Sequence, residues 1–310
     1  MSFNNIIGEE VPKKILQNSL QTGRISSAYL FKGEEGVGKS SVALIFAKAL
    51  NCTLGVYDSC DTCEVCTRID KGSEPDLIKI LPEGNILIDE IRFLKKWTSL
   101  KPYRKFKVAI IKDADRMTEE ASNAFLKILE EPPTRVVFIL TTTRPHALPL
   151  TIRSRCQHVP FRKLTKEEIE LFLKKEKRLE SEKLKLIAAL AAGSIGRALR
   201  LLDEEELRKL SFEFFKALPE RRLNYIERLK AEDANKFLYY FVSFYRDLMF
   251  MTLDYKDRIR NYDLIPELDG SKISMDMISK GIEICEQVSE SIKRNIDKQL
   301  LLYYLTKNLP

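Results

Sequence analysis

The stretch Gly33-Glu-Glu-Gly-Val-Gly-Lys-Ser40 constrains the fold of this chain more than any other feature. It fits the phosphate-binding pattern G-x-x-x-x-G-K-[ST], and it follows an apolar run at 28–32 and precedes a helical pattern, as the motif requires. Glycines allow backbone N–H groups to point into a loop that cradles phosphates, where Lys39 reaches the β- and γ-phosphates and the Ser40 hydroxyl binds Mg²⁺. The stretch predicts a strand–loop–helix unit whose candidate nucleotide-binding residues are Gly33, Gly36, Gly38, Lys39 and Ser40.

The first half of the sequence predicts a parallel sheet. Five short runs of Val, Ile, Leu and Phe show little alternation with polar residues, which is typical of strands buried on both faces. The runs lie at 28–32, 77–81, 107–112, 136–140 and 156–161, and helical patterns separate them. Strand–helix alternation of this kind predicts an α/β module covered by helices on both sides.

The pattern becomes helical after Leu164. Thr165-Lys-Glu-Glu168 fits a capping box, so a helix is expected to begin there. We expect a domain at 1–164, a three-helix lid at 165–205 and an all-helical domain at 206–310. An aromatic stripe on the predicted helix at 234–255 favours a buried core or a subunit interface over a ligand pocket.

The residues after the third apolar run make a poor centre for hydrolysis. An ATPase needs an acid at the end of this strand to hold Mg²⁺, but Lys112 occupies that position. Strand alternation predicts that the side chain of Asp113 points to the opposite face. The sequence therefore combines a good phosphate cradle with a poor hydrolytic centre.

Four cysteines form the second strong motif. Cys52-x7-Cys60-x2-Cys63-x2-Cys66 contains two interlocking C-x2-C steps, which predicts a structural zinc site with four thiolate ligands. Four thiolates leave no open position for water, so we assign no catalysis to the site. The alternatives are a pair of redox C-x-x-C motifs and chance clustering.

Composition excludes several other classes of protein. With 44% hydrophobic and 31% charged residues, the 310-residue chain has the composition of a soluble globular protein. The longest apolar stretch, 237–253, contains Arg246 and Asp247, so no membrane span is expected. The N-terminus lacks the basic and apolar regions of a secretory signal, so a cytoplasmic protein is expected. The net charge of +7 allows an anionic partner.

A family resemblance joins these motifs. Phe3-Asn-Asn-Ile-Ile-Gly8, the phosphate loop, the four-cysteine insert, the run 124–133 (AFLKILEEPP) and Ser154-Arg-Cys156 occur in that order. Together they resemble the bacterial clamp-loader subunits of the AAA+ superfamily. The resemblance covers the first 205 residues closely and the helical remainder by length and pattern. It implies that the chain is part of a hetero-pentameric ring, which a helical collar holds together. The other subunits of this ring would be gamma/tau and delta. The ring would use ATP to place a sliding clamp on primed DNA.

Within that family the sequence favours the delta-prime class over the ATPase (gamma/tau) class. The ATPase subunits have an apolar strand that ends in Asp-Glu, where this chain has Lys112-Asp113. Their second-sensor motif resembles Gly-Ser-x-Arg-Asp-Ala-Leu, and Gly196 stands where its nucleotide-sensing arginine would be. Because the sequence ends at residue 310, we also expect no long tail of the tau type. The resemblance leaves binding of ATP and Mg²⁺ open and implies a chain that is not itself an active ATPase.

The resemblance also assigns a role to Arg155. As an isolated feature, Arg155 before a buried strand is an ordinary surface arginine. In clamp loaders the arginine of Ser-Arg-Cys is a finger that reaches the ATP of the neighbouring subunit. Thr142 matches the first-sensor position. Two other functions remain open: an active gamma-type ATPase subunit, and a stand-alone P-loop enzyme unrelated to replication.

Overall fold

The computed structural model describes residues 2–176, 180–217, 219–226, 228, 234–264, 274–294 and 296–310. The chain forms two compact units. The first contains Met1–Glu176 and Ala192–Arg197, and the second contains Lys177–Ala191 and Ala198–Pro310. Because the short segment 192–197 packs with the first unit, the chain returns to that unit after it has left it.

The first unit is built on a parallel sheet of five strands in the order β2-β3-β4-β1-β5. These strands confirm the five expected runs: β1 (Ala28–Lys32), β2 (Leu77–Ile80), β3 (Lys107–Ile111), β4 (Val136–Thr142) and β5 (Gln157–Pro160). Strands β1 and β4, which pair with each other inside the sheet, are almost entirely buried. Their burial on both faces explains why the sequence lacks alternation.

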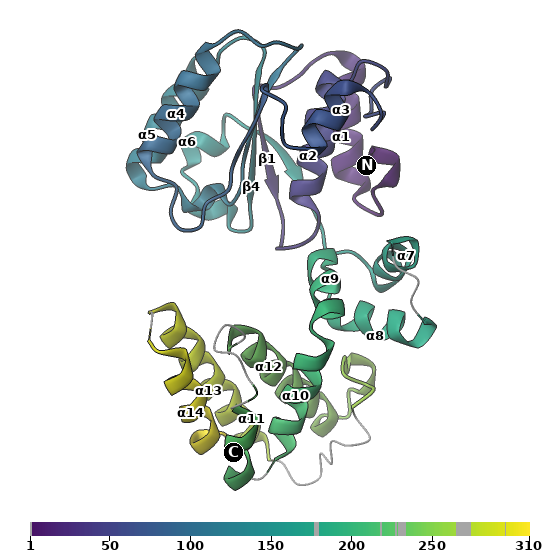
Figure 1. Cartoon of the computed structure of the whole chain (residues 1–310), viewed down its shortest axis with the longest axis vertical. Helices are drawn as coiled ribbons and strands as arrows, with labels where there is room; N and C mark the ends of the chain where they lie inside the picture. Colours follow the sequence, from purple (N-terminus) through teal and green to yellow (C-terminus); the bar gives the residue numbers. More distant parts are fainter. Residues whose placement is uncertain are drawn as a thin grey trace. The chain divides into compact units, whose positions relative to one another are not determined.

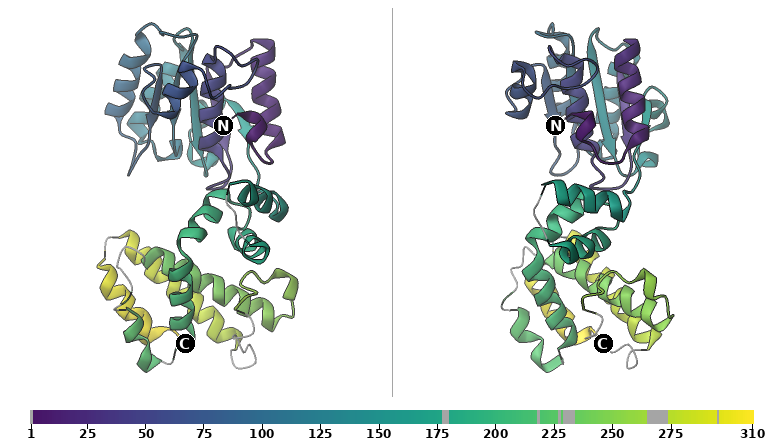
Figure 2. Two further views of the ribbon diagram at one scale, coloured as in Figure 1. Left: turned by 45° about the vertical axis from the view of Figure 1, so that its right-hand side comes forward. Right: turned by 90° about the vertical axis from the view of Figure 1, so that its right-hand side faces the viewer.

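Helices cover both faces of the sheet, as the views in Figures 1 and 2 show. One face packs against α1 (Glu10–Thr22) and α2 (Lys39–Asn51), with the short α3 (Glu64–Asp70) beyond α2. The other face packs against α4 (Ile88–Ser99) and α5 (Glu119–Glu130), with α6 (Leu150–Arg153) beside α5.

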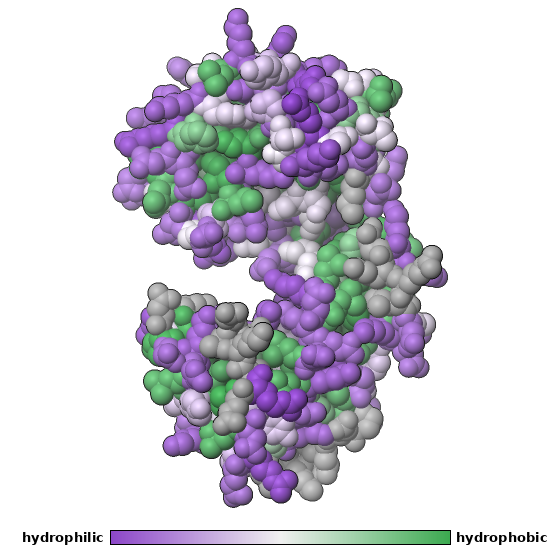
Figure 3. Space-filling view, viewed as in Figure 1, coloured by the Kyte–Doolittle hydropathy of each residue, from purple (hydrophilic) through white to green (hydrophobic). Residues whose placement is uncertain are grey.

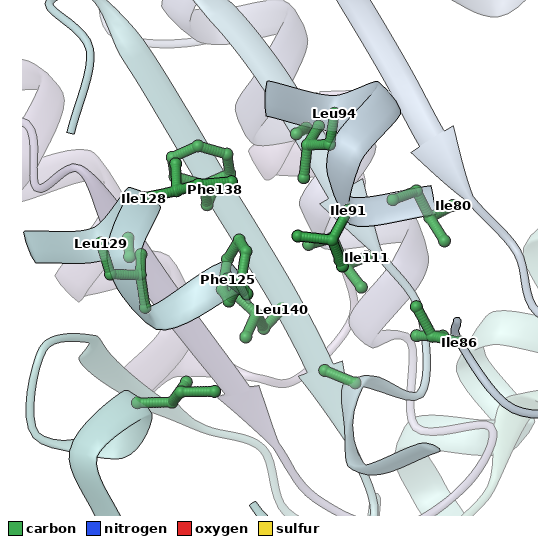
Figure 4. Close-up of a cluster of buried hydrophobic side chains, with 14 of the residues drawn as sticks. Ile80, Ile86, Ile91, Leu94, Ile111, Phe125, Ile128, Leu129, Phe138 and Leu140 are labelled. Atoms are coloured by element: carbon green, nitrogen blue, oxygen red, sulfur yellow. The ribbon is translucent and has the colours of Figure 1, made fainter. Parts of the chain in front are cut away.

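Alternate residues of β1, β3 and β4 enter the two cores. Phe138 and Leu140 of β4 point toward α5, where the ring of Phe125 meets that of Phe138 edge-on at 5.4 Å (Figure 4). Val137 and Ile139 enter the opposite core, on the side of α1 and α2. The α/β class expected from the sequence is therefore confirmed.

The described elements of the second unit are helical. They are α8 (Ser181–Ala191), α10 (Glu205–Lys216), α11 (Leu223–Ile226), α12 (Ala234–Thr252), α13 (Met275–Lys293) and α14 (Lys298–Asn308), with short 3-10 turns between them. The aromatic stripe of α12 is buried, and the rings of Phe237 and Phe241 lie 5.2 and 5.3 Å from the ring of Phe214. The stripe therefore forms core.

Two helices join the units along the chain. α7 (Lys166–Glu176) begins with the expected capping box, because Thr165 and Glu168 exchange hydrogen bonds between side chain and backbone. α9 (Ile195–Asp203) begins in the segment that packs with the first unit. The expected boundaries at 164 and 205 remain predictions.

The surface of the first unit is mostly polar in the view of Figure 3, with hydrophobic residues exposed as a patch among charged ones. Among the residues that the structure describes, we find no helix whose length and hydropathy would allow it to span a membrane.

Candidate functional site

The phosphate loop lies between β1 and α2, at the carboxyl end of the sheet. Gly36 and Gly38 have φ angles of 74° and 103°, a region that residues with a Cβ rarely adopt. Gly38 is the last residue before α2, so the loop leads directly into the positive end of that helix dipole. The loop therefore has the backbone of an anion-binding turn.

Lys39 is 7% exposed and its ammonium lies inside the loop. Its Nζ donates hydrogen bonds to the carbonyl oxygens of Gly33 at 2.7 Å and Glu34 at 2.6 Å. Burial lowers the pKa of Lys39, and the nearby carboxylates of Asp113 and Glu35 oppose that shift. Ser40 is exposed at the first turn of α2. The structure thus brings the expected phosphate-binding residues together.

A polar pocket of about 440 Å³ lies beside the loop, and both charge signs line it. Its residues are Glu35, Lys112, Asp113, Asp115, Arg116, Thr143 and Arg144. The expectation that Asp113 points away from the site is wrong. β3 ends at Ile111, and Asp113 adopts a left-handed φ of 48°, so strand alternation no longer applies to its side chain.

Asp115 is already engaged by two neighbours. Its carboxylate accepts a hydrogen bond from Thr142 Oγ1 at 2.7 Å and from Arg144 Nε at 2.9 Å, and its side chain is 3% exposed. Thr142, the expected first sensor, is fully buried at the end of β4. Sequence reasoning missed the Asp115–Arg144 pair, because 29 positions separate the two residues.

A second, mostly apolar pocket of about 210 Å³ is lined by Glu9, Glu10, Val11, Pro12, Pro160, Phe161 and Arg162. Glu9 is 2% exposed, and its Oε1 has no hydrogen-bond partner among the described residues. Burial raises the pKa of Glu9 to about 7, although the backbone and charge of Arg162 oppose the shift. No pattern in the sequence indicates this buried carboxyl.

Replacing Glu9 with Gln should make stability less dependent on pH. The folded protein keeps the Glu9 proton up to a pKa of about 7, whereas the unfolded chain loses it near 4.5, so this contribution to stability disappears as pH rises through 7. Glutamine stays neutral, so the stability of Glu9→Gln relative to wild type should increase by about 1–2 kcal/mol between pH 5 and 8. Urea denaturation followed by the fluorescence of Trp97 measures the free energy of unfolding of both proteins at pH 5 and pH 8. The same difference in stability between variant and wild type at both pH values would contradict the prediction.

The four motif cysteines lie together in the insert, with all Sγ atoms within 4.8 Å of one another. The Sγ of Cys66 lies 3.8 Å from that of Cys52 and 4.0 Å from that of Cys60, and the sulfurs of Cys52 and Cys63 are 3.9 Å apart. Zn–S bonds of ~2.3 Å in a tetrahedron place the sulfurs about 3.8 Å apart. The four cysteines therefore fit one zinc ion.

Backbone N–H groups surround these sulfurs. Gly55 donates to Cys52 Sγ at 3.1 Å, and the N–H of Cys63 donates to Cys60 Sγ at 3.2 Å. Burial would raise the pKa of the Cys63 thiol, but hydrogen bonds from the backbone of Thr53 and Cys66 and from neighbouring side chains lower it to about 6. Such donors stabilise the thiolate form that binds metal.

Arg155 lies at the amino ends of the strands, whereas the phosphate loop lies at their carboxyl ends. It precedes β5, whose residues Gln157 and Pro160 pair in parallel with Tyr29 and Lys32 of β1. About four residues of strand, roughly 13 Å, therefore separate the level of Arg155 from that of the loop. Its side chain is 39% exposed and contacts Glu130 at 3.1 Å. The structure does not bring Arg155 to its own phosphate loop.

Comparison with known proteins agrees with this architecture. The profile of the family described as "DNA polymerase III, delta subunit" matches residues 8–165, half of the chain. This chain therefore belongs to that family of AAA+ clamp-loader subunits, which confirms the expected family.

Two curated relatives match about two thirds of the chain. The sequence is 41% identical over 209 residues to DNA polymerase III subunit tau of Bacillus subtilis, covering 65% of this chain and 37% of the relative. It is 39% identical over 210 residues to subunit tau of Escherichia coli strain K12, covering 66% of this chain and 33% of the relative. The chain thus spans little more than a third of these relatives.

A solved structure shares the fold over most of the chain. A gamma-subunit-related protein of DNA polymerase III from Thermotoga maritima aligns with a TM-score of 0.54 at 21% identity. The alignment covers 96% of this chain and 97% of that protein. At this identity the likeness concerns the fold alone.

Proposed function

We propose that this chain is a delta-prime-type subunit of a bacterial clamp loader, which helps to load the sliding clamp onto primed DNA in the cytoplasm. It would work in a hetero-pentameric ring with gamma/tau and delta subunits. It would supply Arg155 in trans to a neighbour's ATP and hydrolyse little or no ATP itself. Zinc would hold the four-cysteine insert, and part of the basic surface would face DNA.

The position of Arg155 carries the proposal. An exposed guanidinium at the amino ends of the strands, away from its own phosphate loop at their carboxyl ends, is unsuited to act on nucleotide bound by the same chain. Its contact with Glu130 is an exposed ion pair, which costs little to exchange for a phosphate on another subunit. Arginine offers the planar set of donors that such a contact needs.

The residues beside the chain's own phosphate loop favour little or no ATP hydrolysis by this chain. Lys112 lines the pocket beside the phosphate loop and repels a divalent cation, and the carboxylate of Asp115 is bound to Thr142 and Arg144. Asp113 lines the same pocket and lies close enough to Lys39 to interact with its charge. The residues could hold phosphates, but they offer poor ligands for the metal that hydrolysis uses.

An active gamma-type ATPase subunit is the second candidate. The intact phosphate loop and the similarity to tau and gamma subunits favour it. Mixing the purified chain with gamma- and delta-type subunits and measuring the assembled mass tests the ring role that both share. A chain that stays monomeric under these conditions would contradict both and favour a stand-alone P-loop enzyme.

Replacing Lys112 with Asp should make nucleotide binding depend on Mg²⁺. In the wild type we expect the affinity for ATP to change less than about threefold when EDTA replaces Mg²⁺, because a resident ammonium already supplies positive charge. In Lys112→Asp we expect Mg²⁺ to increase affinity about tenfold. Calorimetric titration with and without EDTA measures both, and Lys101→Asp is the charge-matched surface control. A wild type that requires Mg²⁺ would contradict the prediction.

A further inference from the structure

The beginning of α9 packs against the phosphate loop within the first unit. The backbone N–H of Gly196 donates to the carbonyl oxygen of Gly36 at 2.9 Å, and the Ser194 hydroxyl donates to that of Glu35 at 3.0 Å. Both contacts hold the outer, carbonyl side of the loop. The N–H groups that bind phosphate belong to the other side of the same peptide units.

Helix chemistry explains why these donors are available. The first N–H groups of a helix have no partner within the helix, and Gly196 is the second residue of α9. The Ser194 hydroxyl also accepts a hydrogen bond from the N–H of Arg197 at 3.2 Å, as an N-cap does. Ser194 therefore caps α9 and contacts the phosphate loop at the same time.

The close approach depends on two glycines. A Cβ at position 196 would lie 3.0 Å from the Cα of Gly36, which is a backbone atom that cannot swing away. A Cβ at position 36 would lie 2.2 Å from the Ser194 hydroxyl oxygen. The contact leaves no room for a side chain at 196 unless the backbone moves.

A tight turn fixes the segment before α9. Ala192 and Gly193 have φ angles of 51° and 89°, and the carbonyl oxygen of Gly193 accepts from the N–H of Leu164 at 3.0 Å. A Cβ at Gly193 would lie 2.7 Å from the Cβ of Lys163. The segment is thus held at Leu164 before it reaches the phosphate loop.

We infer that Ser194–Gly196 is a backbone latch that positions the phosphate loop, with Ser194 and Gly196 as positioning residues. The latch supplies donors for the carbonyls of Glu35 and Gly36, while Lys39 supplies donors for those of Gly33 and Glu34. Position 196 is therefore occupied by a structural contact and is not a sensor position that merely lost its arginine. Only the consequence for nucleotide binding rests on the proposed function.

Hydrogen exchange tests the latch without any nucleotide. In Gly196→Ala and Ser194→Ala, the amides of 33–38 should exchange about tenfold faster than in the wild type. Ser194→Ala removes the hydrogen bond to Glu35, and Gly196→Ala places a Cβ against the backbone of Gly36. The strands β1 and β4 should keep their protection. Gly84→Ala and Ser99→Ala are matched controls, since nothing lies within 4 Å of a Cβ at Gly84 and Ser99 is exposed. Unchanged exchange at 33–38 in Ser194→Ala, or a uniform increase throughout the unit, would overturn the latch.

Replacing Gly196 with Arg distinguishes a latch at position 196 from a sensor position that has lost its arginine. In Gly196→Arg the latch predicts about tenfold weaker binding of ATP, because the new Cβ displaces the phosphate loop. A lost sensor predicts tighter binding, and that result would overturn the inference. If ATP does not bind the wild type, nucleotide binding fails as part of the proposed function, and the exchange experiment still decides whether the latch exists.

Discussion

A clamp loader assembled with Arg155→Ala should lose ATP turnover at the site next to this subunit, while the chain itself keeps its fold and its own nucleotide binding. An arginine that stabilises charge on the γ-phosphate is worth ~10³–10⁵ in rate at its site. The loss for the whole ring will be smaller, because other sites continue to turn over. The measurement is steady-state ATP turnover in the presence of clamp and primed DNA.

Two variants control this experiment. Arg68→Ala removes another exposed arginine whose ion pair, with Glu64 at 3.2 Å, resembles that of Arg155 with Glu130. It should leave turnover unchanged. Arg155→Lys should rescue poorly, since an ammonium cannot reproduce the planar contact of a guanidinium with phosphate. Equal turnover for wild type and Arg155→Ala, with assembly confirmed, would make Arg155 an ordinary surface residue.

Cys63→Ser should abolish stoichiometric zinc binding and destabilise the first unit by at least about 2 kcal/mol. The cysteines pack with Val65 and Ile69 in a small core, so loss of the metal also loosens apolar contacts. The insert is further held by Lys48, whose Nζ lies 2.9 Å from Asp61 and 2.6 Å from Asp70. This anchoring should keep the first unit folded despite its lower stability, so that assembly remains possible.

Metal analysis together with urea denaturation measures the effect. Cys156→Ser is the control, because Cys156 is a partly buried thiol of the same unit outside the cluster. It should keep one zinc per chain. Wild-type protein that contains no zinc after purification under reducing conditions would rule out the metal site.

Local patterns in the sequence predicted much of the fold. Each buried strand is a short apolar run bounded by turn residues, and the phosphate loop and the four cysteines carry their geometry in their spacing. The strand boundaries differ from the expected ones by at most two residues. These features could be predicted from neighbouring residues because each of them forms within a short stretch of chain.

Contacts between distant segments could not be predicted. Gly36 and Gly196 meet across 160 positions, and nothing near either residue indicates the other. The buried carboxyl of Glu9 depends on Phe161 and Arg162, which close the pocket from another part of the chain. Asp113 was misplaced because its left-handed φ reverses the direction that strand alternation predicts. Glu9 and Asp113 both act on the charge of Lys39, so the electrostatics of the site could be described only from the folded structure.

ATP turnover by the isolated wild-type chain, with Mg²⁺ and primed DNA present, tests the central claim most directly. A subunit that lends Arg155 to a neighbour and carries Lys112 beside its own loop should hydrolyse ATP far more slowly than about 1 s⁻¹, an ordinary enzymatic rate. The same preparation should support turnover once gamma- and delta-type subunits are added. Turnover near 1 s⁻¹ by the chain alone would contradict the account and identify an active gamma-type ATPase.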